Sequence, residues 1–223
     1  MGWISFATVF AAFLLTHSLP LRPAVKPWLV GVFGARGFTV AYSALSLVML
    51  GVLIWAAGQA PQVPLWPQLP WLRHAAQLGM AVVCLIVALG LARPNPFSFG
   101  GAQNDRFDPD RPGIVRWLRH PILTALALWA GVHVLPNGDL AHVVLFGTLG
   151  GFALAGMGLI DRRKQRRMSP QAWSALRARV ARGPILPVPA SWRGAVVRLI
   201  AGAVVFAILA GLHPLVIGVT ALP

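Results

Sequence analysis

Six apolar stretches, separated by basic or turn-rich connections, constrain this chain more than any other feature. They cover residues 3–19, 38–57, 75–92, 121–135, 140–160 and 194–217. A helix of about 20 mostly apolar residues crosses a bilayer core, where every backbone group must be bonded within the spanning structure. With 57% apolar and 11% charged residues, the sequence predicts an all-α integral membrane bundle of about six transmembrane helices. Its length predicts a single domain over residues 1–223.

Basic residues are concentrated in every second connection between the spans. Eighteen of the nineteen Lys and Arg residues lie in the first, third and fifth connections or at the start of the last span, and only Arg73 lies in the second. Because short basic loops stay in the cytoplasm, this bias predicts a multi-pass protein of the bacterial inner membrane with periplasmic termini. The net charge of +14 is therefore attributed to topology, and no nucleic-acid partner is expected.

The fifth connection combines a charge run with an amphipathic segment. The run from Arg162 to Arg167 is interpreted either as a contact for anionic lipids or as a topology determinant alone. Ser169 is suited to cap a helix that follows it. Because Trp173, Leu176 and Val180 share one face of that helix, it is expected to lie at the membrane interface, beside the spans.

Small residues recur every four positions along the fifth span, at Gly147, Gly151 and Ala155. Rows of this kind allow two helix backbones to approach closely in lipid. We therefore interpret this face of the span as a packing surface and not as a substrate cavity.

Histidines are the residues of this chain most expected to bind a cofactor or take part in a reaction. His17 and His133 fall inside apolar spans, and His120 precedes the fourth span. Ionisable side chains at membrane depth are uncommon, and imidazole is a frequent ligand of haem and metals. His17 also ends an aromatic stripe on the first span, formed by Phe6, Phe10 and Phe13. His74 and His142 are expected at the interface, and His213 is intermediate between the two groups.

A set of short motifs runs along the chain in a fixed order. It comprises Thr16-His17-Ser18, Gly34-Ala35-Arg36-Gly37-Phe38, Tyr42-Ser43, Asn95-Pro96-Phe97, Arg119-His120-Pro121, and His133 followed by Asn137-Gly138-Asp139. Together these segments resemble the NnrU family over essentially the whole chain. The resemblance implies a bacterial membrane protein associated with denitrification and nitric-oxide metabolism.

The same superfamily includes the plastid 15-cis-zeta-carotene isomerase, which uses a haem b. By this resemblance, His17 and His133 match the ligand histidines of the isomerase, and the implied cofactor is haem b. The isomerase has a cysteine three residues before the second ligand, where this chain has Ala130. The resemblance thus implies a haem-dependent isomerase or redox enzyme acting on an apolar or small-molecule substrate. A non-enzymatic accessory factor for nitrogen-oxide reductases is the alternative.

The predicted spans leave the second iron ligand open. His17 falls in the cytoplasmic half of the bilayer and His133 in the outer half, roughly 15 Å apart in depth at about 1.5 Å per residue. His120 matches the depth of His17 better and is the alternative ligand. Arg36 and Arg119, both on the cytoplasmic side, are the candidate partners of haem propionates.

The Arg119-His120-Pro121 motif also resembles a second family, the isoprenylcysteine carboxyl methyltransferases, which bind S-adenosylmethionine. Those enzymes need a downstream acidic motif that contains Glu. Because this chain has five acidic residues and every one is Asp, methyltransferase activity is the less favoured interpretation.

Overall fold

The computed structural model describes residues 1–186 and 189–221, which form seven α-helices and no strand. The helices are α1 (Trp3–Ser18), α2 (Lys26–Gly58), α3 (Pro70–Gly90), α4 (Pro121–Asn137), α5 (Leu140–Met168), α6 (Pro170–Arg182) and α7 (Trp192–Ile217). Five of them, namely α1, α2, α3, α5 and α7, are long and apolar enough to cross a membrane, and α4 is a shorter apolar helix. The predicted all-α membrane bundle is confirmed.

The chain divides into two compact units, and each is described by itself. Unit 1 comprises residues 1–67 and 138–145, and unit 2 comprises residues 68–137 and 146–223. Helix α5 begins in unit 1 and continues in unit 2. The prediction of a single domain over residues 1–223 stays a prediction.

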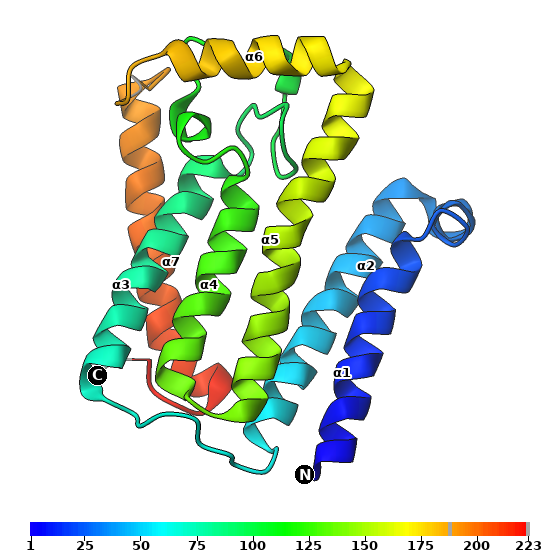
Figure 1. Ribbon diagram of the computed structural model, residues 1–223, viewed down its shortest axis with the longest axis vertical. Helices are drawn as coiled ribbons and strands as arrows, with labels where there is room; N and C mark the ends of the chain where they lie inside the picture. The colour runs from blue at the N-terminus through cyan, green and yellow to red at the C-terminus, as the bar shows by residue number, and fades with distance from the viewer. Residues whose placement is uncertain (187–188, 222–223) are drawn as a thin grey trace. The chain divides into compact units, whose positions relative to one another are not determined.

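Unit 1 is built on the pair α1 and α2, which lie side by side (Figure 1). Helix α2 is kinked at Gly34, whose φ of 69° and ψ of 164° interrupt the helical geometry. Only glycine adopts such a conformation without steric cost. Lys26–Gly58 therefore consists of two helical segments joined at the kink, and the segment that carries the second apolar stretch begins after Gly34, close to the predicted start at Phe38.

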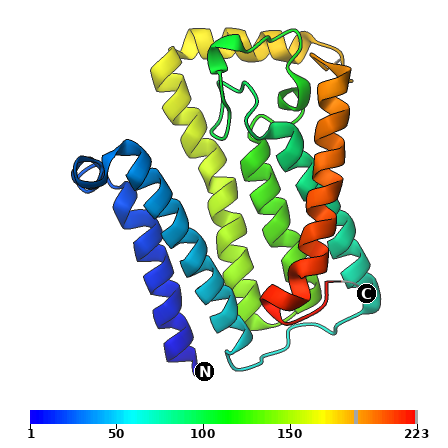
Figure 2. The same cartoon turned by 180° about the vertical axis from the view of Figure 1, so that it is seen from behind.

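In unit 2, α3 packs against both α4 and α7, as Figures 1 and 2 show from opposite sides. Glycines allow these approaches: a Cβ atom at Gly79 would lie 2.3 Å from a Val132 methyl group on α4. A Cβ at Gly202 of α7 would lie 3.1–3.2 Å from atoms of α3. In lipid, close backbone contact of this kind holds helices together.

The glycine face of α5 differs from the predicted one. A Cβ at Gly150 would lie 3.3 Å from Ala130, and a Cβ at Gly156 would lie 3.5 Å from Leu123, both on α4. At Gly147 and Gly151, an added Cβ meets no described atom within 4 Å. The predicted row is therefore wrong as the packing face within unit 2. Spacing identified small residues but not the rotation of the helix.

Helix α6 crosses the ends of the other helices of unit 2 (Figures 1 and 2). The predicted cap is present, because the Ser169 hydroxyl accepts a hydrogen bond of 3.3 Å from the Ala172 amide. The apolar face of α6 is buried by protein: Trp173 and Val180 pack with Phe97 of the third connection. This cluster fixes the third connection, residues 91–120, over the end of the bundle.

Candidate functional site

The five residues predicted to hold a cofactor are divided between the two units. His17 and Arg36 belong to unit 1, whereas Arg119, His120 and His133 belong to unit 2. The predicted pair His17 and His133 thus joins two separately described units and stays a prediction. The surroundings of each histidine show which of its ring nitrogens remains available.

His17 lies on α1 against two hydroxyl groups of α2. Its Nδ1 atom is 3.3 Å from the hydroxyl oxygens of both Tyr42 and Ser46, and the Tyr42 hydroxyl donates to the His17 carbonyl at 2.9 Å. The imidazole stacks on Phe13 with centroids 5.6 Å apart. With Nδ1 anchored, Nε2 is the nitrogen of His17 left for a ligand.

His120 is buried in a polar network at the α6 end of unit 2. Its Nδ1 is 3.0 Å from the Ser98 hydroxyl, and its Nε2 is 3.0 Å from Oδ1 of Asp161. Arg119 holds the same carboxylate with two hydrogen bonds, of 3.0 Å and 2.5 Å. Both ring nitrogens of His120 are therefore engaged, and binding iron would require one of these bonds to break.

The protonation of His120 follows from this network. The residue precedes α4, outside the membrane-spanning helices, and burial lowers its pKa below the ordinary value of 6.5. The Asp161 carboxylate opposes this effect, whereas the charges of Arg119 and Arg177 lower the pKa further. The lowered pKa favours the neutral imidazole at pH 7. Its Nε2 lies within hydrogen-bond distance of both Oδ1 of Asp161, at 3.0 Å, and Nε of Arg119, at 3.3 Å, so the tautomer decides which of these two contacts it makes.

Asn95, 1% exposed, extends the network into the third connection. Its side-chain amide donates to the Arg119 carbonyl at 3.1 Å, and its side-chain oxygen accepts from the Phe97 amide at 3.0 Å. Sequence reasoning placed Asn95 in a motif but did not find Asp161 as the partner of Arg119 and His120. The available signal was a single carboxylate at the end of an apolar helix, which requires a cationic partner.

His133 lines a cavity and is hydrogen-bonded at one of its ring nitrogens. Its Nδ1–H donates to the Trp129 carbonyl, one turn earlier on α4, at 2.7 Å. Its ring centroid lies 5.1 Å from those of Trp129 and Phe146. A backbone hydrogen bond at Nδ1 fixes the tautomer and orientation of an imidazole that binds a metal through Nε2. Nδ1 of His133 is thus engaged, which leaves Nε2 as the ring nitrogen that could bind a ligand.

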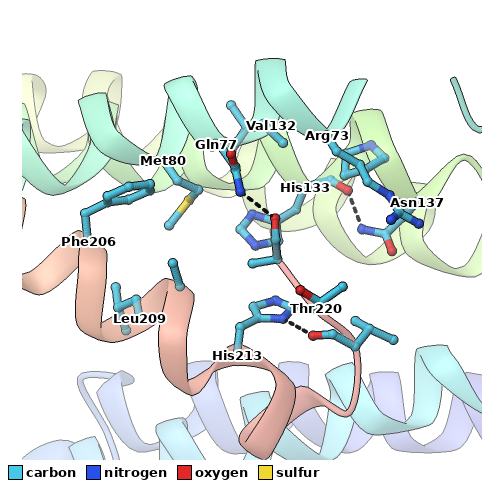
Figure 3. Close-up of a pocket in the computed structure, with 15 residues that line it drawn as sticks. Arg73, Gln77, Met80, Val132, His133, Asn137, Phe206, Leu209, His213 and Thr220 are labelled. Atoms are coloured by element: carbon cyan, nitrogen blue, oxygen red, sulfur yellow. Dashed lines mark hydrogen bonds between the residues drawn. The ribbon is translucent and has the colours of Figure 1, made fainter. Parts of the chain in front are cut away.

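The cavity that His133 lines has a volume of about 260 Å³ and lies between α3, α4, α7 and the segment after α7. His213 of α7 lines it too, with its Nδ1 2.7 Å from the Val219 carbonyl. Figure 3 shows both rings beside the C-terminal segment, where Gln77 donates to the Ala221 carbonyl at 2.8 Å. Sequence analysis left His213 as intermediate and did not pair it with His133.

Two histidines are the nitrogen donors that line this cavity. Haem iron takes one or two axial ligands from the protein, and histidine is a common one. His133 and His213 each hold Nδ1 against a backbone carbonyl, so that each can offer Nε2. Among residues 1–186 and 189–221, no group of three or more His, Cys, Asp or Glu side chains suited to a metal ion is found.

The two arginines predicted to pair with propionates differ in availability. Arg36 is exposed on α2 in unit 1, and its role stays a prediction. Arg119 already uses two of its N–H groups on Asp161. Any anion bound by Arg119 must therefore use the remaining face of its guanidinium.

Membrane-length helices around a small cavity lined by histidines define the protein as a multi-pass helical membrane protein with a candidate ligand site between α3, α4 and α7. A family model described as NnrU protein matches residues 5–221, nearly the whole chain. The chain belongs to the NnrU family. Comparison with curated proteins and with solved structures gives no match.

Proposed function

We propose that this NnrU-family protein binds haem b through the Nε2 atom of His133 and acts in nitric-oxide metabolism. The observation that supports the proposal is that His133 lines a cavity while its Nδ1 is hydrogen-bonded to the Trp129 carbonyl. The link to nitric oxide and denitrification comes from the family. A haem at this place would supply one-electron chemistry and a binding position for a small ligand.

The residues of the cavity have separate roles in this proposal. Trp129 fixes the orientation of the His133 ring through its carbonyl. Met80, Phe206 and Leu209 supply apolar walls (Figure 3), which exclude water and favour an uncharged or weakly polar ligand. His213 is the second ligand that unit 2 offers, and His17 is the one that the family resemblance implies.

The size of the cavity limits the ligands that it can hold without a change in structure. Sites for drug-sized ligands typically measure about 300–1,000 Å³, and a haem exceeds the 260 Å³ of this cavity. The segment with Val219, Thr220 and Ala221 supplies part of the wall. Binding a whole macrocycle therefore requires this segment to move away, which breaks the hydrogen bond between Gln77 and Ala221.

The chemistry proposed is redox or ligand binding and does not use an exchange between histidine and cysteine ligands. Ala130 occupies the position of the isomerase cysteine and is buried, 1% exposed, against α5. The single cysteine, Cys84, lies on α3 and is also buried. A substrate isomerised by haem would have to react without a thiolate ligand from position 130.

The test is an absorption spectrum of detergent-purified protein, oxidised and reduced, after expression with added haem precursor. Single substitutions to Ala at His133, His213, His17 and His120 should be compared with the matched control His74→Ala. His74 has the same Nδ1 contact to a carbonyl four residues earlier, at 3.1 Å, but is exposed and does not line the cavity. We expect the Soret band to disappear with His133→Ala and to persist with His74→Ala.

The other variants identify the second ligand. Loss of the band with His213→Ala assigns both ligands to unit 2, whereas loss with His17→Ala supports the pair implied by the family. Loss with His120→Ala supports the alternative derived from membrane depth. A normal spectrum for His133→Ala, or a wild-type protein without a Soret band, would overturn the proposal and favour a non-enzymatic accessory role.

A further inference from the structure

A second cavity lies at the opposite end of unit 2, beneath α6. It measures about 160 Å³ and is lined by Arg116 and Arg119 of the third connection and by Arg177 of α6. Phe97 and Val180 from the apolar cluster form its floor, and Trp117 also lines it. Three arginine side chains thus line one small cavity.

The positions of two of these arginines are set by hydrogen bonds. Arg119 is held by its two bonds to Asp161. Arg116 donates from Nε to the Pro184 carbonyl at 3.4 Å and from Nη2 to the Gly183 carbonyl at 3.2 Å. In both side chains, Nη1 makes no hydrogen bond to any described residue. Hydrogen bonds therefore fix the orientation of both guanidinium groups, and each keeps an N–H donor that can bind a ligand.

Arg177 completes the site from the other side. Its guanidinium stacks over the Trp173 ring, 4.9 Å from the centroid, and that of Arg119 is 5.8 Å from the same centroid. Arg177 has no acidic partner among the described residues. The buried Nε1–H of Trp173 also lacks an acceptor there. The guanidinium groups of Arg119 and Arg177 thus both lie near one indole, and Arg119 is paired with Asp161.

The charge of the cavity is consequently unbalanced. Three cations and no carboxylate line the cavity, and the nearby Asp161 is already paired with Arg119. Solvent at the exposed Arg177 screens the mutual repulsion of the three cations but does not remove it. A phosphate group would relieve this repulsion, because its oxygens accept the parallel hydrogen bonds that guanidinium forks donate. The volume of 160 Å³ suits a compact anion and not a drug-sized molecule.

We propose that the cavity lined by Arg116, Arg119 and Arg177 binds a phosphate group, carried either by the headgroup of an anionic phospholipid or by a soluble phosphate compound. The surroundings suit a lipid source. Trp117 is 55% exposed and donates to the Ile185 carbonyl at 2.6 Å, and Ile185 is 77% exposed. Apolar side chains beside a cationic cavity are the surface that an acyl chain and its headgroup would contact together.

The proposal is independent of haem binding at His133 and needs only the detergent-purified protein. Thermal unfolding should be measured during titration with dihexanoyl phosphatidic acid, with dihexanoyl phosphatidylcholine and with inorganic phosphate. We expect phosphatidic acid to raise the unfolding midpoint at the lowest concentration and phosphatidylcholine to have little effect. Stabilisation by phosphatidic acid alone identifies a lipid headgroup, whereas equal stabilisation by inorganic phosphate identifies a soluble ligand.

Two variants locate the site. Arg177→Gln should weaken the apparent affinity for phosphatidic acid between roughly ten- and a hundredfold, the range for a lost hydrogen bond to a charged group. Arg106→Gln is the matched control, because Arg106 lies in the same connection and does not line the cavity, and its side chain hydrogen-bonds to Gln103. Arg177→Lys keeps the charge but lacks the fork, and should bind with intermediate affinity.

Three results would overturn the proposal. The first is the same affinity for phosphatidic acid in wild type and Arg177→Gln. The others are a loss of affinity in Arg106→Gln as large as in Arg177→Gln, and stabilisation by phosphatidylcholine equal to that by phosphatidic acid. If Arg177→Gln does not fold, native mass spectrometry of the wild-type protein gives a measurement without a variant. There, phosphatidic acid must be retained at detergent concentrations that remove phosphatidylcholine, and its loss together with phosphatidylcholine contradicts the site.

Discussion

Removing the carboxylate of Asp161 should destabilise unit 2 more than removing any other acidic group of the chain. Asp161 is 16% exposed in its side chain and accepts three hydrogen bonds, two from Arg119 and one from His120. Loss of one partner of a buried ion pair costs about 3–5 kcal/mol. Because Arg119 is 30% exposed, water screens part of this effect, and about 3 kcal/mol is expected for Asp161→Ala.

The assay is equilibrium unfolding in mixed micelles, followed by circular dichroism. Asp161→Asn keeps one acceptor but loses the charge, so about half the effect, roughly 1–2 kcal/mol, should remain. Asp110→Ala is the control: Asp110 pairs with Arg179 in a bridge whose side chains are 62% and 59% exposed, and exposed pairs of this kind contribute little. Similar losses for Asp161→Ala and Asp110→Ala would refute the network as a source of stability.

A double variant separates lost pairing from lost packing. In Arg119→Met with Asp161→Leu, neither charge is left without a partner, and apolar side chains fill the space. Replacement of a whole buried pair by apolar groups is often nearly neutral. We expect the double variant to be more stable than Asp161→Ala, and the opposite order would mean that Arg119 supports the fold mainly through other contacts.

Three further outcomes are expected. Because the pKa of His120 is lowered by folding, the unfolded state takes up more protons, and stability should fall as pH decreases through 6.5 towards the lowered value; thermal unfolding of His120→Gln should show a smaller pH dependence. Gly79→Ala would place a Cβ 2.3 Å from a valine methyl of α4 and should cost about 1–3 kcal/mol, while Gly151→Ala should leave the unfolding midpoint unchanged. Single cysteines at Ser169 and Gly138 should react with impermeant thiol reagents from opposite sides of the membrane, and labelling from one side would refute the six-span topology.

Segments whose structure depends on neighbouring residues were predictable from the sequence. Hydropathy located the cores of the spans, and Ser169 correctly marked the start of α6, because a capping hydroxyl acts on an amide three residues away. The ends of the helices were less predictable. Hydropathy located the apolar run that begins after Arg36, but it did not predict the separate helical segment over residues 26–33 that precedes the kink at Gly34.

Contacts between helices were not predictable, because they depend on rotation about each helix axis. The spacing of Gly147 and Gly151 is the same whether that face meets a helix or not, and Gly150 and Gly156 make the contact with α4 instead. The partnership of Asp161 with Arg119 spans 42 positions. Only the requirement that a carboxylate in an apolar helix be paired connects these two residues before the structure is known.

The histidines show which feature of the candidate site cannot be predicted from the neighbouring sequence. His74 and His133 both place Nδ1 beside the carbonyl of the residue four positions earlier, a contact that helical geometry alone provides. The two residues are therefore alike at Nδ1, and they differ in their surroundings. His133 lines a cavity whose opposite wall comes from α7, 80 positions away at His213, whereas His74 lies outside it. The choice of ligand histidine is thus decided by tertiary packing, which the comparison of His133→Ala with His74→Ala measures directly.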